Sequence, residues 1–117
     1  MPVSLELHDF ESEVAAGDQT IPAPVRGQNV VARFDGRRRG TDADRVLVVA
    51  AHYDSDWNTC GVADNGSGVA ALLVTASRLV ADLMRRRAHL LNTVLFVAFD
   101  IQNVEHVRFA DAFFRLL

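Results

Sequence analysis

The first part of the chain shows the two-residue period of β-strands. Val3, Leu5 and Leu7 alternate with polar residues, which predicts a half-buried first strand. Residues 11–27 contain glycines and prolines among small polar residues, and this composition predicts a loop. A second strand is predicted over residues 29–36, "NVVARFDG". The polar segment "RRRGTDAD" then predicts a turn, after which the second strand pairs with the strand that follows.

Two apolar runs flank a long segment with helical periodicity. Residues 46–51, "VLVVAA", lack alternation, as expected of a central strand covered on both faces, and residues 92–100, "NTVLFVAFD", predict a second buried strand. Between them, apolar residues recur on one face of a helix, at Val69, Leu72, Leu73, Ala76, Leu79, Val80 and Leu83. Asp64, Asn65 and Ser67 precede this helix and are good N-cap types. Strand, helix and strand at this length predict parallel strands joined by a right-handed βαβ crossover in an α/β protein with a mixed β-sheet.

The remaining sequence predicts a final helix over residues 104–117. This helix ends on two leucines with no cap or polar tail, which suggests a chain that is incomplete at its C-terminus. We therefore expect an N-terminal strand and loop over residues 1–28, followed by an incomplete α/β domain over residues 29–117.

Composition and charge narrow the classes of function. The 117 residues have a net charge of −3, which gives no electrostatic support for nucleic-acid binding. The two arginine triplets, residues 37–39 and 85–87, are interpreted as solvated loop and helix-end charge. A single cysteine, Cys60, excludes an internal disulfide and a multi-thiolate zinc site, and is interpreted as an inert thiol. We recognise no signal peptide and no apolar run of about 20 residues that would span a membrane, so the compartment stays open.

Polar residues gather where the first apolar strand ends, in "AHYDSDWNTCGVADNGSG". Ligand sites of open α/β sheets lie at the carboxyl ends of parallel strands, and a neutral histidine such as His52 is a natural metal ligand there. Asp54 points to the same side as His52 if the chain is extended, so its carboxylate can hold the imidazole N–H. Asp64 can bridge two metal ions. Plainer interpretations stay open: His52 as a hydrogen-bonded structural residue and Asp64 as a helix cap.

Taken together, "HYDS", "GVADNGSGVAALL" and "NTVLFVAFD" resemble the di-zinc aminopeptidases of metallopeptidase family 28, which also includes glutamate carboxypeptidases. The resemblance runs from about residue 29 to about residue 113. It implies the N-terminal part of a zinc-exopeptidase fold, of the phosphorylase/hydrolase-like class, and a peptide substrate. It also implies two zinc ions, with His52 as a ligand of one, Asp64 as the carboxylate that bridges both, and Asp54 as the partner that orients His52.

The chain departs from this family after "FVAFD". The family has two consecutive glutamates there, the first a general base and the second a zinc ligand, whereas this chain has Gln102 and Asn103. An amide accepts no proton in that role and is a poor ligand for zinc, so no intact catalytic residue is expected. Glu105 and His106 lie one helical turn further on, too far to stand in. Val74 also occupies a place where the family often has glutamate.

Two hypotheses of function follow. The first is a zinc aminopeptidase-like domain that is inactive as this chain stands, with zinc bound weakly or not at all. The second is a non-catalytic module with a peptidase fold that serves as an interaction or structural domain, with a protein partner that the sequence does not identify.

Overall fold

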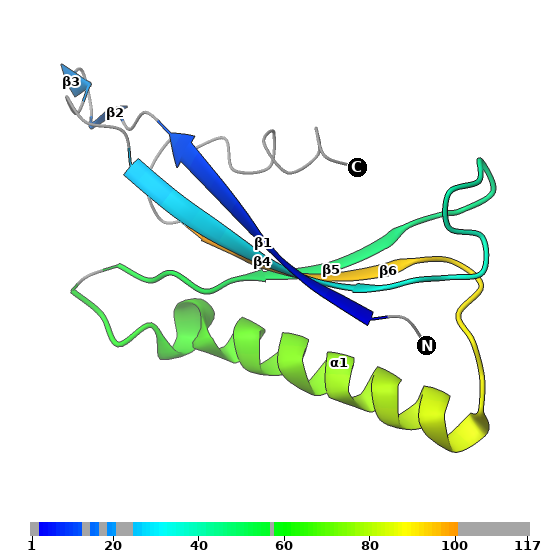
Figure 1. The fold of residues 1–117 in the computed structure, drawn as a ribbon. Helices are drawn as coiled ribbons and strands as arrows, with labels where there is room; N and C mark the ends of the chain where they lie inside the picture. The colour runs from blue at the N-terminus through cyan, green and yellow to red at the C-terminus, as the bar shows by residue number, and fades with distance from the viewer. Residues whose placement is uncertain (1–2, 13–14, 17–18, 21–24, 57, 101–117) are drawn as a thin grey trace.

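The computed structural model describes residues 3–12, 15–16, 19–20, 25–56 and 58–100. In this part of the chain, a four-stranded mixed sheet has the order β1-β4-β6-β5 and carries one long helix, α1, on one face (Figure 1). The strands are β1 (Val3–Ser12), β4 (Val25–Phe34), β5 (Leu47–His52) and β6 (Val94–Phe99), and the helix α1 spans Ser67–Arg86. Two short strands, β2 (Ala15–Ala16) and β3 (Gln19–Thr20), form a separate antiparallel pair.

The β5-α1-β6 unit confirms the predicted strand, helix and strand. β5 and β6 lie side by side and parallel, with Leu47 opposite Val94 and His52 opposite Phe99. α1 packs against both strands. The core between helix and sheet is a cluster of four buried side chains, Phe34, Leu72, Val94 and Phe96. A second, smaller cluster on the opposite face of the sheet contains Val31, Leu95 and Val97.

The strand order corrects two predictions. β4 pairs with β1 and with β6, so it is not the neighbour of β5, and β5 lies at an edge of the described sheet. The central place belongs to β6, whose first four residues are all buried. We attribute this order to burial, because β6 carries larger side chains, two of them phenylalanines, and gains more by being flanked on both sides.

β1 is the predicted strand, but its apolar side chains lie on the more exposed face. Val3, Leu5 and Leu7 are between 50% and 72% exposed, because α1 packs mainly on β5 and β6, at the other side of the sheet from the edge strand β1. The predicted loop over residues 11–27 is also shorter than expected, since β1 continues to Ser12, β4 begins at Val25, and β2 and β3 lie between them.

The helix is confirmed, and its apolar residues extend beyond the face that packs on the sheet. Leu72 is buried, whereas Leu73, Val74 and Met84 are exposed. With the turn that leads into it, the 25-residue segment Val62–Arg86 is long and apolar enough to cross a membrane by length and composition. The segment contains no unbroken apolar run of that length, because small and polar residues interrupt it. These residues lower its mean hydropathy only slightly, so it still passes a test based on length and composition. One face of the helix nevertheless packs on the sheet.

Two predictions about organisation stay untested. The final helix over residues 104–117 lies outside the described residues. The division of the chain into residues 1–28 and 29–117 also stays a prediction.

Candidate metal centre

The candidate site lies at the carboxyl edge of the parallel pair β5 and β6. His52 is the last residue of β5 and is only 9% exposed. Asp54 follows two residues later, and Asp64 lies in the turn Val62–Gly66 that leads into α1. The fold therefore brings these three predicted side chains to one place, from two segments separated by a loop.

The imidazole of His52 is held from one side by Asp54. Its Nδ1 lies 3.2 Å from the carboxylate Oδ1 of Asp54 and 3.2 Å from the backbone oxygen of the same residue. Both neighbours are acceptors, so Nδ1 carries the hydrogen and donates it. In the neutral imidazole, Nε2 then presents a lone pair on the side facing away from Asp54.

Asp64 faces that second nitrogen. Its Oδ1 lies 3.0 Å from Nε2 of His52, and the Asp64 side chain is 73% exposed. The helix-cap interpretation of Asp64 is wrong, because α1 begins without a side-chain cap hydrogen bond at its N-cap, Gly66. Instead, Oδ1 of Asn65 accepts the backbone N–H of Gly68 at 3.0 Å.

The backbone of this turn sets the position of Asp64. Gly66 donates its N–H to the oxygen of Gly61 at 2.7 Å, which closes the turn. Gly61 has φ +62°, and a Cβ at this position would lie 2.6 Å from the side chain of Ser55. Glycine is therefore required here both by conformation and by space. Asp64 itself has an extended backbone and is followed by a cis peptide bond to Asn65.

The distance between Nε2 of His52 and Oδ1 of Asp64 is about 0.4 Å shorter than the separation of two ligands on one zinc ion. Bonds of about 2.0–2.2 Å from zinc to nitrogen and oxygen at a tetrahedral angle place these atoms about 3.4 Å apart, and the observed separation is 3.0 Å. A structural or catalytic zinc takes at least three protein ligands. The described residues contain no group of three or more His, Cys, Asp or Glu side chains that could hold a metal ion.

The sequence itself decides the family. Residues 29–101 match the sequence model of peptidase family M28, which is more than half of the chain. The chain belongs to peptidase family M28. This confirms the predicted family, whose members are generally zinc-dependent.

A solved structure supports the M28 fold. The chain is similar to a glutaminyl cyclase from an Acidobacteriales bacterium, with 24% sequence identity and a TM-score of 0.52. The similarity covers 82% of this chain and 29% of the glutaminyl cyclase chain, so this chain spans less than a third of that protein. At 24% sequence identity, this similarity is evidence for a shared fold alone.

A hydrogen-bond network beside the M28 site was missed by the sequence analysis. Asp100 follows β6, and its Oδ2 accepts the backbone N–H of Gln28 at 3.0 Å. The backbone N–H of Asp100 is donated to Oδ1 of Asn29, which is fully buried. This network ties the end of β6 to β4. A polar Asn29 at the start of an apolar strand was the available signal.

Tyr53 joins the same network. Its hydroxyl donates to the backbone oxygen of Gln28 at 2.5 Å. Burial raises the pKa of Tyr53 to about 12, and the negative charges of Asp100 and Asp54 act in the same direction. The hydroxyl therefore keeps its proton at neutral pH and stays a donor.

Several predicted M28 site positions are not placed. Gln102, Asn103, Glu105 and His106 lie outside the described residues. Cys60 is described and exposed, in agreement with an isolated thiol.

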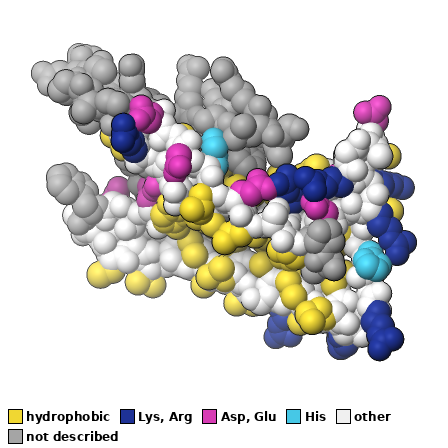
Figure 2. All heavy atoms as spheres, viewed as in Figure 1, with side chains coloured by type: hydrophobic (Ala, Val, Ile, Leu, Met, Phe, Trp, Pro, Cys, Tyr) yellow, Lys and Arg dark blue, Asp and Glu magenta, His cyan; other side chains and the backbone are white. Residues whose placement is uncertain are grey.

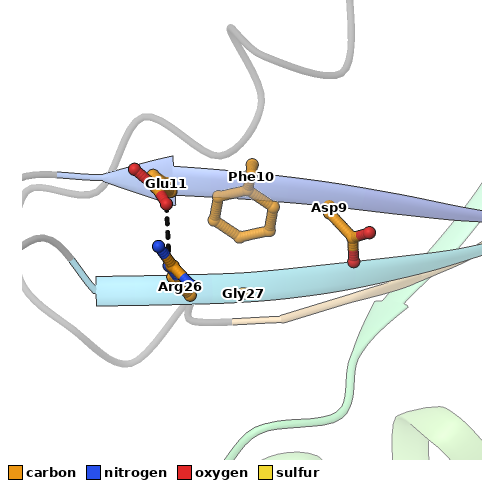
Figure 3. A pocket seen from close by; sticks show the side chains of 5 residues that line it. All are labelled: Asp9, Phe10, Glu11, Arg26 and Gly27. Carbon is orange, nitrogen blue, oxygen red and sulfur yellow. Dashed lines mark ion pairs between the residues drawn. The ribbon is translucent and has the colours of Figure 1, made fainter.

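A separate hollow of about 450 Å³ lies between β1 and β4 (Figure 3). Asp9, Phe10, Glu11, Arg26 and Gly27 line it, and Arg26 pairs with Glu11 at 2.7 Å. None of the three candidate site residues contributes to this hollow.

Proposed function

We propose that this chain is a zinc aminopeptidase-like domain of family M28, related to enzymes that remove N-terminal residues from peptides, and that it is catalytically inactive as it stands. In this proposal His52 and Asp64 are the two remaining metal ligands, and Asp54 orients His52. By the same relationship, we propose the N-terminal part of a zinc-exopeptidase fold with a right-handed β5-α1-β6 crossover.

The arrangement of acceptors around His52 carries the metal part of the proposal. Oxygens of Asp54 and Asp64 face the two ring nitrogens at 3.2 and 3.0 Å. A neutral imidazole has one N–H, so one of these oxygens faces a nitrogen lone pair. This contact is unfavourable unless a cation binds both that oxygen and that nitrogen, or the ring takes up a second proton. A metal ion that binds Nε2 and the Asp64 carboxylate relieves this conflict.

The inactive state is supported by the amides at positions 102 and 103. M28 enzymes resembling this chain place a general base and a zinc ligand at the corresponding positions, and Gln102 and Asn103 perform neither role. When two zinc ions are bound in such a site, they lower the pKa of a shared water to make a nucleophile. This chain has His52 and Asp64 to contribute to that task.

We predict that zinc binds weakly or not at all, because two donors offset little of the cost of dehydrating the ion. Isothermal titration should show no tight site. Any weak binding should be lost in His52→Ala and kept in His89→Ala, a matched histidine variant at the far end of α1, and in Cys60→Ser. Two equivalents of zinc retained through gel filtration would contradict the proposal.

The activity test uses restored carboxylates. The double variant Gln102→Glu/Asn103→Glu should remain inactive on aminoacyl chromogenic substrates and on an N-terminal glutaminyl peptide, with zinc added. A general base contributes about 10²- to 10⁴-fold, and only when a metal-bound water is in place. The same change in a chain extended by the C-terminal half of an active M28 relative should gain turnover. Zinc-dependent turnover by the unmodified chain that is lost in Asp64→Asn would overturn the proposed inactivity.

The second candidate is a non-catalytic module with an M28 fold that binds a protein partner. The observation that favours it is again the Gln102-Asn103 pair, two amides at positions where the family has a general base and a zinc ligand. The two candidates differ in whether they need metal-binding side chains. A non-catalytic module needs neither His52 nor Asp64, so His52→Ala should leave the binding of its protein partner unchanged.

A further inference from the structure

The two arginine triplets, distant in the sequence, meet at one end of the molecule. Arg37 donates its backbone N–H to Leu90, and Arg38 donates to Leu91, both at 3.0 Å. These hydrogen bonds join the loop after β4 to the segment that follows α1. We call this surface the basic end and define it by seven arginines, Arg37, Arg38, Arg39, Arg45, Arg85, Arg86 and Arg87.

Four carboxylates, those of Asp35, Asp42, Asp44 and Asp82, belong to the same segments and leave the seven arginines with a net charge of +3. Arg39 pairs with Asp35 at 2.7 Å, and Arg85 pairs with Asp82. Within the described part of the chain, no carboxylate lies within ion-pair distance of the other five arginines, and all of them are exposed. Figure 2 shows most of the dark blue side chains gathered at this end of the molecule.

Exposed apolar side chains lie among these arginines. Met84 and Leu91 are 73% and 52% exposed, and Val46 is also exposed. They come from the same three segments as the arginines: the end of α1, the segment after it, and the loop before β5. A surface that mixes arginine with exposed aliphatic side chains suits the interface of a bilayer, where the guanidinium groups meet phosphate and the aliphatic groups enter the acyl boundary.

Nucleic acid fits this surface less well. Residues 35–46 and 83–93 contain no phenylalanine, tyrosine or tryptophan on which a base can stack. The net charge of −3 opposes long-range attraction to nucleic acid and to an anionic bilayer alike, so the lack of stacking side chains is what separates the two partners.

We propose that the basic end docks on the surface of a membrane that contains anionic phospholipids. This role is separate from the candidate metal centre, because Asp64 precedes the first turn of α1, whereas Arg85 and Arg86 form its last turn. The two triplets are exposed in a loop and at the end of α1, as predicted, and the proposal adds a role to them.

Flotation with lipid vesicles tests the proposal. The 117-residue chain should float with vesicles of phosphatidylcholine and phosphatidylserine and stay in solution with phosphatidylcholine alone. Binding should weaken by about fivefold for each arginine removed, so Arg37→Gln/Arg38→Gln should lose about 25-fold. Added salt should weaken binding of the unmodified chain in the same direction.

The double variant Arg26→Gln/Arg78→Gln is the matched control. It removes the same charge from outside the basic end, so its partition should change by less than about fivefold. Circular dichroism should show both double variants folded, since all four side chains are exposed. Failure of the unmodified chain to float, equal losses in the two double variants, or tighter binding to duplex DNA than to anionic vesicles would each overturn the proposal.

Discussion

At the scale of single residues, Asn29 is the polar group on which the site end of the sheet depends most. It is fully buried, its Oδ1 accepts the backbone N–H of Asp100 at 3.0 Å, and its Nδ2 lies 3.3 Å from Nδ1 of His8. Asn29→Ala leaves that N–H without an acceptor, so we expect a loss of about 1–3 kcal/mol in the free energy of unfolding, measured by urea denaturation.

The neighbouring Gln28 provides the control. Among the described residues, its side chain donates a hydrogen bond to the exposed Asp9, whereas its backbone groups make the hydrogen bonds with Asp100 and Tyr53. Gln28→Ala should therefore change the free energy of unfolding by less than about 0.5 kcal/mol. Similar losses in the two variants would refute the role given to Asn29.

A second residue, Asp44, makes stability depend on pH. Its carboxylate accepts the backbone N–H of Thr93 at 2.8 Å and the hydroxyl of Thr93 at 2.7 Å. These hydrogen bonds, helped by the charges of Arg38 and Arg39, hold the pKa of Asp44 below its ordinary value. A lowered pKa in the folded state stabilises the fold above the ordinary value, and this stabilisation is lost as the pH falls below about 4.

We therefore expect Asp44→Asn to lower the midpoint of urea denaturation at neutral pH. In acid, the midpoints of the variant and of the unmodified chain should converge. Asp42→Asn is the matched control, because it removes the same charge from an exposed side chain in the same loop. If the difference in urea midpoint between Asp44→Asn and the unmodified chain stayed constant across the acid range, the ionised carboxylate would not be the stabilising form.

At the scale of elements, α1 offers a pair of adjacent leucines that separates packing from helix propensity. Leu72 is 7% exposed and belongs to the core cluster with Phe34, Val94 and Phe96, whereas Leu73 is 61% exposed. Leu72→Ala should cost about 2–5 kcal/mol in the free energy of unfolding, because it removes buried methyl groups and leaves a cavity.

Leu73→Ala should change the free energy of unfolding by about 0.5 kcal/mol or less, since it removes little buried surface. Thermal or urea denaturation of the two variants checks the comparison. If Leu73→Ala proved as costly as Leu72→Ala, another part of the chain would have to cover the outer face of α1.

Elements with a strong hydrophobic periodicity could be predicted from the sequence, whereas the order of the strands in the sheet could not. The apolar positions from Val69 to Leu83 have one period that suits only a helix, so α1 was found. The order β1-β4-β6-β5 depends on which strand gains most from being flanked twice, and that comparison involves the whole sheet. For the same reason, the alternation of apolar and polar residues predicted the strand β1, but it could not predict which element packs on the apolar side chains of that strand.

The candidate site shows the same division. The contact between His52 and Asp54 follows from their spacing on an extended chain, and this short-range geometry can be derived from the sequence. The approach of Asp64 to Nε2 requires the closed turn between Gly61 and Gly66, which the sequence marked only as glycine-rich. Asp100, Gln28 and Asn29 meet across two strands, so their network depended on an unknown strand order.

At the scale of the whole molecule, β5 is one of the two edge strands of the described sheet, and β1 is the other. Leu47 and Tyr53 donate their N–H groups to the β6 side, so the N–H groups of the alternate residues Val48 and Ala50 point to the other side. Among the described residues, no strand pairs with that side of β5. The strand carries no lysine, proline or bulge of the kind that protects edges, so it can recruit a strand from another molecule.

We predict that Ala50→Lys reduces concentration-dependent self-association, because a charge on an edge strand opposes pairing with a second copy. Sedimentation velocity over a concentration series measures this. Ala81→Lys, on the exposed side of α1, adds the same charge away from the edge and should leave self-association nearly unchanged. An equal reduction in both variants would indicate a general effect of net charge.

The length of α1 fixes the separation between the candidate metal centre and the basic end. Asp64 lies just before the helix, and Arg85 and Arg86 form its last turn, so 20 residues at 1.5 Å each place them about 30 Å apart. The field of a charged surface falls off over about 8 Å at physiological ionic strength. A molecule docked through its basic end would thus hold His52 and Asp64 in bulk solution, where proton and cation concentrations are those of the surrounding medium rather than those of the lipid headgroups.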